Sequence, residues 1–161
     1  MKYRVKEIDP QQFIFTKTQL NNGTIVNVKY RDDSLEFQSP KMKINRVEKK
    51  NDHNYVILEL LSTLACKTFY TKLLEIEKCL GPEIDNPIKS VFNENMVTIK
   101  IPFTKSQNPL VKVYRDDALF NYYHLEESME VICLLSLDKL WINNFNEYSY
   151  QLTAKEIMVT N

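Results

Sequence analysis

Apolar and polar residues alternate with a period of two along much of the chain, and this pattern predicts β-strands. In residues 96–101, valine or isoleucine at every second position alternates with methionine, threonine and lysine, and Pro102 ends the segment. Residues 110–115 alternate in a similar way. Because alternate side chains of a strand share a face, each segment would bury one face and expose the other. We expect the two strands to form a hairpin through residues 103–109.

Two further strand pairs are predicted in the first part of the chain. Residues 13–18 and 24–30 flank an Asn-Asn-Gly turn, which is typical of a hairpin. Residues 35–61 predict a ribbon of two strands around the polar turn 51–54. The second arm of this ribbon is almost entirely apolar, as expected of a strand that packs against a core.

A helical period appears in one long segment, which follows Leu61. Ser62 or Thr63 can cap the helix, which continues to Leu80, and the Gly-Pro pair that follows ends it. Apolar residues recur at helical spacing on one face, with Glu77 as the single lapse. A short helical turn is predicted over residues 87–92.

The last part of the chain predicts a loop and two strands. Residues 116–127 are polar and aromatic and are interpreted as a loop, 129–137 as a buried strand, and 148–159 as the last long strand. Strands, one helix and more strands follow one another without βαβ alternation. We therefore predict a mainly β fold, an OB-fold-like β-barrel with one long α-helix. Residues 1–33 would form an N-terminal hairpin extension packed on the barrel, and residues 34–161 the OB-like domain.

Composition narrows the function classes. A chain of 161 residues suits a single domain, and 21 basic against 21 acidic residues exclude a strongly basic nucleic-acid condenser while allowing a local basic groove. No run approaches the about 18 apolar residues of a membrane span, so we expect an intracellular protein without a membrane partner. Three cysteines and two histidines without paired spacing predict free thiols, no metal site and no cofactor. With 2 glycines, a phosphate-binding glycine loop is absent from the sequence.

The tetrapeptide Tyr-Arg-Asp-Asp occurs twice, at residues 30–33 and 114–117. Tyr-x-Asp-Asp is the metal-holding turn of reverse transcriptases, but the chain is far too short for a polymerase and no third carboxylate motif accompanies it. A strand followed by a polar turn explains both copies better. His124 stands near two glutamates without a nucleophile beside it, so we predict no catalytic residues and no enzyme.

The remaining signal is a set of basic and aromatic side chains expected to point outward. In the ribbon, Lys41 and Lys43 alternate with the inward Met42 and Ile44. Such a surface suits single-stranded nucleic acid, because cations follow the phosphates and flat rings stack on unpaired bases without reading sequence. The candidates obtained in this way are Lys41, Lys43, Arg46, Lys49, Lys50, Tyr55, Lys100, Phe103, Lys112 and Tyr114.

Two segments resemble a known family. Residues 35–44 (Leu-Glu-Phe-Gln-Ser-Pro-Lys-Met-Lys-Ile) and the end of the chain, residues 131–157 with Trp141 and Tyr148, are similar to the single-stranded-DNA-binding proteins of nucleocytoplasmic large DNA viruses. Those in turn resemble the replication protein of T7-type phages. The resemblance implies an OB-fold and DNA-binding roles for Trp141 and Tyr148, with Lys41, Lys43 and Arg46. A core position is the alternative for Trp141, because Leu140 and Ile142 flank it.

From these observations we expect non-sequence-specific binding of single-stranded DNA during viral DNA replication or repair, in the host cytoplasm or the virion. Replication proteins and a second copy of the chain are further candidate partners. The chain ends without the acidic tail by which phage relatives recruit partners, so recruitment of that kind is not expected. The alternative is a non-enzymatic protein-interaction β-domain, a virion or transcription-machinery subunit, and the aromatic residues 120–124 would suit its interface.

Overall fold

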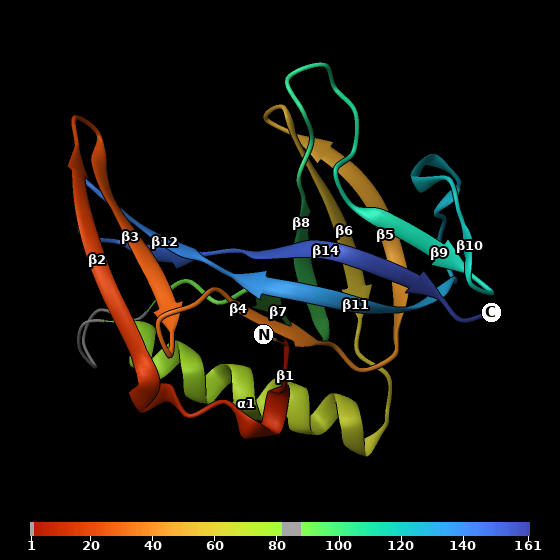
Figure 1. Ribbon diagram of the computed structural model, residues 1–161, viewed down its shortest axis with the longest axis horizontal. Coiled ribbons are helices and arrows are strands. Elements are labelled where there is room, and N and C mark those ends of the chain that lie inside the picture. Colours follow the sequence, from red (N-terminus) through yellow and green to blue (C-terminus); the bar gives the residue numbers. More distant parts are fainter. Residues whose placement is uncertain (1, 82–87) are drawn as a thin grey trace.

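Five strands close into a β-barrel in the computed structural model, which describes residues 2–81 and 88–161 (Figure 1). In ring order they are β5 (Met42–Lys50), β6 (His53–Glu59), β8 (Met96–Ile101), β14 (Leu152–Val159) and β11 (Glu130–Leu137). The barrel is mixed, because β14 runs parallel to β8 and antiparallel to β11. Leu58, Ile99 and Leu135 are fully buried inside it. The predicted mainly β barrel is confirmed.

Shorter strands extend this sheet at both ends. On one side, β4 (Leu35–Gln38) pairs with β11, and β1 (Lys2–Arg4) pairs with β4. On the other side, β9 (Lys112–Arg115) lies beside β14, followed by β10 (Ala118–Leu119). The two-residue strand β7 (Phe92–Asn93) pairs with β8. Three short 3-10 helices cover Val5–Glu7 (η1), Pro10–Gln12 (η2) and Tyr122–His124 (η3).

A second, four-stranded sheet stands beside the barrel and contains the predicted N-terminal hairpin. Its order is β13 (Tyr148–Tyr150), β12 (Lys139–Asn143), β3 (Gly23–Tyr30) and β2 (Phe13–Leu20). Figure 1 shows β2, β3 and β12 projecting to one side of the barrel. Because β12 follows β11 and β13 precedes β14, two chain segments run through both sheets and fix one to the other. The division of the chain into units 1–33 and 34–161 stays a prediction.

Helix α1 (Leu64–Leu80) confirms the predicted long helix and its cap. The Thr63 side chain accepts a hydrogen bond from the Cys66 N–H at 3.1 Å, and Gly81 follows the last turn. Phe69, Leu73 and Ile76 bury the apolar face, and the helix also contacts η1 and η2. Among the described residues there is no helix with both the length and the apolar character needed to cross a membrane.

Glu77, the polar lapse in the helix pattern, is buried with 6% exposure and accepts two hydrogen bonds. The Tyr150 hydroxyl donates to Glu77 Oε2 at 2.5 Å, and the Ser90 hydroxyl donates to the same oxygen at 2.9 Å. The carboxylate therefore joins α1 to β13 and to the segment before β7. A buried carboxylate is tolerated here because two hydroxyl groups donate hydrogen bonds to it.

Both Tyr-Arg-Asp-Asp segments are turns that follow a strand, as predicted. The second joins the paired strands β9 and β10, whereas the first closes a single bridge between Tyr30 and Asp33 and leads from β3 to β4 in the other sheet. In the first copy, Arg31 and Asp32 have φ of 51° and 65°; in the second, Asp116 and Asp117 have φ of 52° and 61°. Two consecutive positive φ angles are characteristic of the type I′ turns that join adjacent antiparallel strands. The turn positions differ by one residue between the copies, so the repeated letters do not represent a structural repeat.

The predicted hairpin between strands 96–101 and 110–115 is wrong. β8 and β9 both lie beside β14 instead, β8 at its beginning and β9 at its end, each in parallel. The connecting loop holds a single antiparallel bridge, between Phe103 and Pro109. A distant third strand thus provides the hydrogen bonds that a hairpin would otherwise have supplied.

Three smaller predictions are also corrected. The last strand is interrupted at Gln151, where the chain passes from β13 in one sheet to β14 in the other. The loop 116–127 contains β10 and η3. Pro87 lies outside the described residues, but residues 88–91 form no helical turn, because the Lys89 N–H pairs with the Tyr148 carbonyl at 2.7 Å in an extended segment.

Alkaline pH should destabilise the barrel through Cys133, which is 1% exposed. Burial raises the pKa of this thiol from 9.0 to about 12. Between these values the thiol ionises in the unfolded chain but stays protonated in the folded one, so the free energy of unfolding should fall by about 1 kcal/mol per pH unit. Urea denaturation across this pH range measures the slope. Cys133→Ala should show a shallower slope, and equal slopes would contradict the assignment.

Candidate nucleic-acid interface

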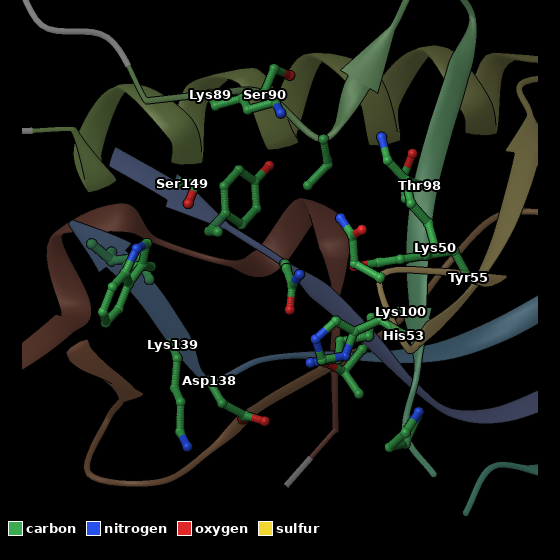
Figure 2. Close-up of a pocket in the computed structure, with 18 of the residues that line it drawn as sticks. Lys50, His53, Tyr55, Lys89, Ser90, Thr98, Lys100, Asp138, Lys139 and Ser149 are labelled. Atoms are coloured by element: carbon green, nitrogen blue, oxygen red, sulfur yellow. The ribbon is translucent and has the colours of Figure 1, made fainter. Parts of the chain in front are cut away.

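A groove of about 1000 Å³ lies between the outer face of the barrel and the second sheet. β5, β6 and β8 contribute one wall, and β12 with β3 contributes the other. Figure 2 shows Lys50, His53 and Lys100 at one side of this hollow, and Lys89 with Ser90 at another. The groove thus gathers residues from segments that lie far apart in the sequence.

The barrel wall presents an aromatic ring beside a cation. Tyr55 on β6 is directly opposite Lys100 on β8, and both face outward because the adjacent Val56 and Ile99 are buried in the core. Lys50 is opposite His53 where β5 and β6 meet. Directly opposed side chains on one face of a sheet are close neighbours, so these residues form one continuous surface.

The second wall carries Trp141 and Lys139, which are two residues apart on β12 and therefore share one face of the strand. Trp141 is half-buried and lies opposite Ile25 of β3. A Cβ at Gly23, which has φ of +154°, would lie 2.5 Å from the Trp141 ring, so this position accepts only glycine without displacing the indole. The backbone therefore supports the ring at the side of the groove.

The floor of the groove contains Ser90 and Tyr150, the two residues that donate hydrogen bonds to Glu77. Burial, and secondly the charge of Glu77, raise the pKa of Tyr150 above its usual range. The Tyr150 hydroxyl thus stays protonated as a donor at physiological pH. The floor is fixed to α1 through this network.

Positive charge exceeds negative charge among the described residues that line the groove. The lysines are Lys50, Lys89, Lys100 and Lys139, and the acids are Glu48 and Asp138. Glu48 pairs with the Arg46 guanidinium at 2.9 Å, which offsets its charge. Lysine ammonium groups in the same groove as Tyr55 and Trp141 can bind phosphates while the two rings contact bases.

Of the residues predicted from the sequence, the groove brings together Lys50, Tyr55, Lys100 and Trp141. The other eight are outside its lining: Lys41, Lys43, Arg46, Lys49, Phe103, Lys112, Tyr114 and Tyr148. A role for these eight in binding stays a prediction.

Several of the eight residues outside the groove have charged or aromatic neighbours in the fold. Lys43 lies opposite Glu59 of β6 and Glu130 of β11, so carboxylates flank it. Lys112 is opposite Glu156 of β14. Phe103 packs edge-on against the ring of Tyr122, with centroids 5.6 Å apart. Each of these three residues thus has a neighbour within the fold, and its position can be explained without a bound nucleic acid.

Sequence reasoning did not select Lys89, Lys139 or His53 for the groove. Lys139 could have been found, because it stands two residues before Trp141 and so shares its face of the strand. His53 is part of a predicted turn, and Lys89 lies in an irregular segment whose position depends on β13. The described residues bring together no group of three or more His, Cys, Asp or Glu that could hold a metal ion.

The fold is similar to that of gp2.5, a single-stranded DNA binding protein encoded by bacteriophage T7. The TM-score with its crystal structure is 0.53 at 10% sequence identity, and the match covers 80% of this chain and 87% of gp2.5. No protein-family model matches the sequence, and no curated protein matches it. At this identity the similarity concerns the fold, an OB-like five-stranded mixed barrel with one α-helix.

Proposed function

We propose that the protein binds single-stranded DNA, without sequence preference, in the groove between the barrel and the second sheet. The observation that carries the proposal is the combination, in one groove, of Tyr55 and Trp141 with four lysines. The similarity in fold to a phage protein that binds single-stranded DNA supports it.

The mechanism needs no covalent chemistry. An unpaired base can stack on the flat faces of Trp141 or Tyr55, and each stacked base contributes about 1–3 kcal/mol. Every base has such a face, so stacking does not select a sequence. Lysines beside the rings neutralise phosphates and release counterions, which makes the affinity depend on salt.

Titration with oligo-dT should quench the fluorescence of Trp141, because this is the single tryptophan of the chain and it lines the groove. If the four groove lysines each neutralise one phosphate, the logarithm of the binding constant should fall against the logarithm of salt concentration with a slope of about −2.8. Affinity would then decrease about 50-fold between about 50 and 200 mM salt.

A DNA duplex with the same number of nucleotides per strand as the oligo-dT is the control for this titration. Its bases are already stacked and paired, so it should quench Trp141 less than oligo-dT does. Binding of oligo-dT that leaves the emission of Trp141 unchanged, or that does not respond to salt, would contradict groove binding.

A protein-interaction function is the second candidate, and an exposed apolar row favours it. Leu119 is 80% exposed and Met158 is 45% exposed, with Tyr114 between them on the adjoining strands. Exposed apolar side chains that lie together suit a protein interface. The two candidates are distinguished by the same titration, since this function predicts no binding of oligo-dT at low salt.

The biological role that we propose is protection of exposed DNA strands during replication or repair in a large DNA virus. The resemblance of residues 35–44 and 131–157 to the proteins of such viruses supports this role, as does the fold of the phage protein. The host cytoplasm or the virion would then be the site of action.

A further inference from the structure

Strand β2 (Phe13–Leu20) forms an unpaired edge of the second sheet. It is the terminal strand in the sheet order and pairs only with β3 among the described strands. All of its residues after Phe13 are exposed, including Ile14 at 47%, Phe15 at 43% and Leu20 at 42%. Figure 1 shows β2 at the outer margin of the molecule. A long, exposed edge with apolar side chains is a template for another strand.

The register of the hairpin identifies the backbone groups that point to this free edge. The Arg31 N–H donates to the Gln12 carbonyl, and the same register continues to the pair of Leu20 with Gly23. Hydrogen-bonded and non-hydrogen-bonded pairs alternate in an antiparallel ladder. Even-numbered residues therefore bond to β3, while the N–H and C=O groups of Phe13, Phe15, Lys17 and Gln19 point outward.

We propose that β2 pairs antiparallel with β2 of a second copy of this chain, across a two-fold axis at Thr16. This register pairs Phe15 with Lys17 of the second copy and Phe13 with its Gln19, so all four outward residues bond. It keeps the Lys17 charges of the two copies from opposing each other. It also places each Lys17 ammonium beside a Phe15 ring, a favourable cation–aromatic pair.

Pairing of this kind would join the two second sheets into one sheet of eight strands. The axis is perpendicular to the sheet, so the same face of each copy lies on the same side. Thr18, Ile25 and Trp141 are in register across β2, β3 and β12, on the face that borders the groove. Both grooves of the dimer would therefore open toward one side.

Lys17→Pro tests the pairing in the absence of DNA, so the result is independent of the proposed function. The substitution removes an N–H that points outward, where an edge strand tolerates proline. Lys17→Ala is the matched control, because it removes the same charge and keeps the N–H. In sedimentation velocity we expect concentration-dependent dimers for the native protein and Lys17→Ala. Lys17→Pro should dimerise about 30-fold more weakly, having lost one hydrogen bond from each copy.

A cross-link tests the register itself. In the proposed dimer the Thr16 residues of the two copies form a non-hydrogen-bonded pair, with Cα atoms about 4.5 Å apart, which a disulfide can span. Thr16→Cys, in a background in which the exposed Cys79 is replaced by serine, should form a covalent dimer on mild oxidation. Thr18→Cys in the same background should not, because its partner position is Ile14.

A Lys17→Pro protein that dimerises as tightly as Lys17→Ala, or a native protein that is monomeric at every concentration, would overturn the proposal. Equal cross-linking at Thr16 and Thr18 would overturn the register. A folded Lys17→Pro protein, checked by circular dichroism, is required for the comparison, and the cross-link gives an independent result if that variant does not fold.

Discussion

Replacing Lys50 and Lys100 together with alanine should lower the affinity for oligo-dT about 150-fold at low salt. Both side chains line the groove, on either side of Tyr55. A charge-assisted hydrogen bond to a phosphate contributes about 1.5 kcal/mol, so the loss of two amounts to about 3 kcal/mol. The salt slope should also become about 1.4 shallower. Fluorescence anisotropy of a labelled oligo-dT measures both quantities.

The matched control is the double substitution of Lys41 and Lys112 with alanine. It removes the same number of charges from exposed positions that lie outside the groove. We expect an affinity within about threefold of the native protein, because side chains outside the groove would make no direct contact with a phosphate held inside it. If this control weakens binding as much as the groove substitutions do, the DNA follows the outer face of the basic ribbon instead of the groove.

Glu77→Ala should lower the free energy of unfolding by about 3 kcal/mol. The substitution removes the acceptor of the Tyr150 and Ser90 hydroxyls, and Tyr150 is only 5% exposed. A buried donor left without a partner costs about 1–3 kcal/mol, and the cavity left by the side chain adds to this cost. Urea denaturation measures the difference. Glu77→Gln should be milder, since the amide oxygen can still accept one hydrogen bond.

Glu75 provides the control on the same helix. Its carboxylate is half-exposed and lies 3.6 Å from the Lys72 ammonium, an arrangement that contributes little to stability. Glu75→Ala should therefore change the free energy of unfolding by less than about 0.5 kcal/mol. If Glu77→Ala is as stable as Glu75→Ala, the hydrogen bonds of Glu77 to Tyr150 and Ser90 do not stabilise the contact between α1 and the floor of the groove.

The sequence predicted those parts of the fold that depend on local pattern. Met42 and Ile44 alternate with lysines and are fully buried, and Thr63 caps the helix as its position suggested. Strand partners were predicted less well, because alternation shows which face is buried but not which neighbour supplies the hydrogen bonds. The segments 96–101 and 110–115 therefore resembled a hairpin, although both pair with β14.

The groove could be predicted only in part for the same reason. Lys100 and Lys112 show the same outward alternation, yet Lys100 lines the groove and Lys112 lies beside Glu156 at the other end of β14. Only the pairing of β8 and β9 along that strand separates them. Lys139 and Trp141 become a wall because β12 leaves the barrel and joins the N-terminal hairpin, a departure that its own residues do not signal.

The continuation of β11 into β12, and of β13 into β14, has a consequence for the rate at which the proposed DNA ligand would bind. Neither wall of the groove can swing independently of the other, since continuous backbone crosses from one to the other at two places. A ligand would enter a groove of fixed width, and binding would not require a closing motion of the protein. Association should then be limited by diffusion and charge attraction, with little entropy lost by the protein itself.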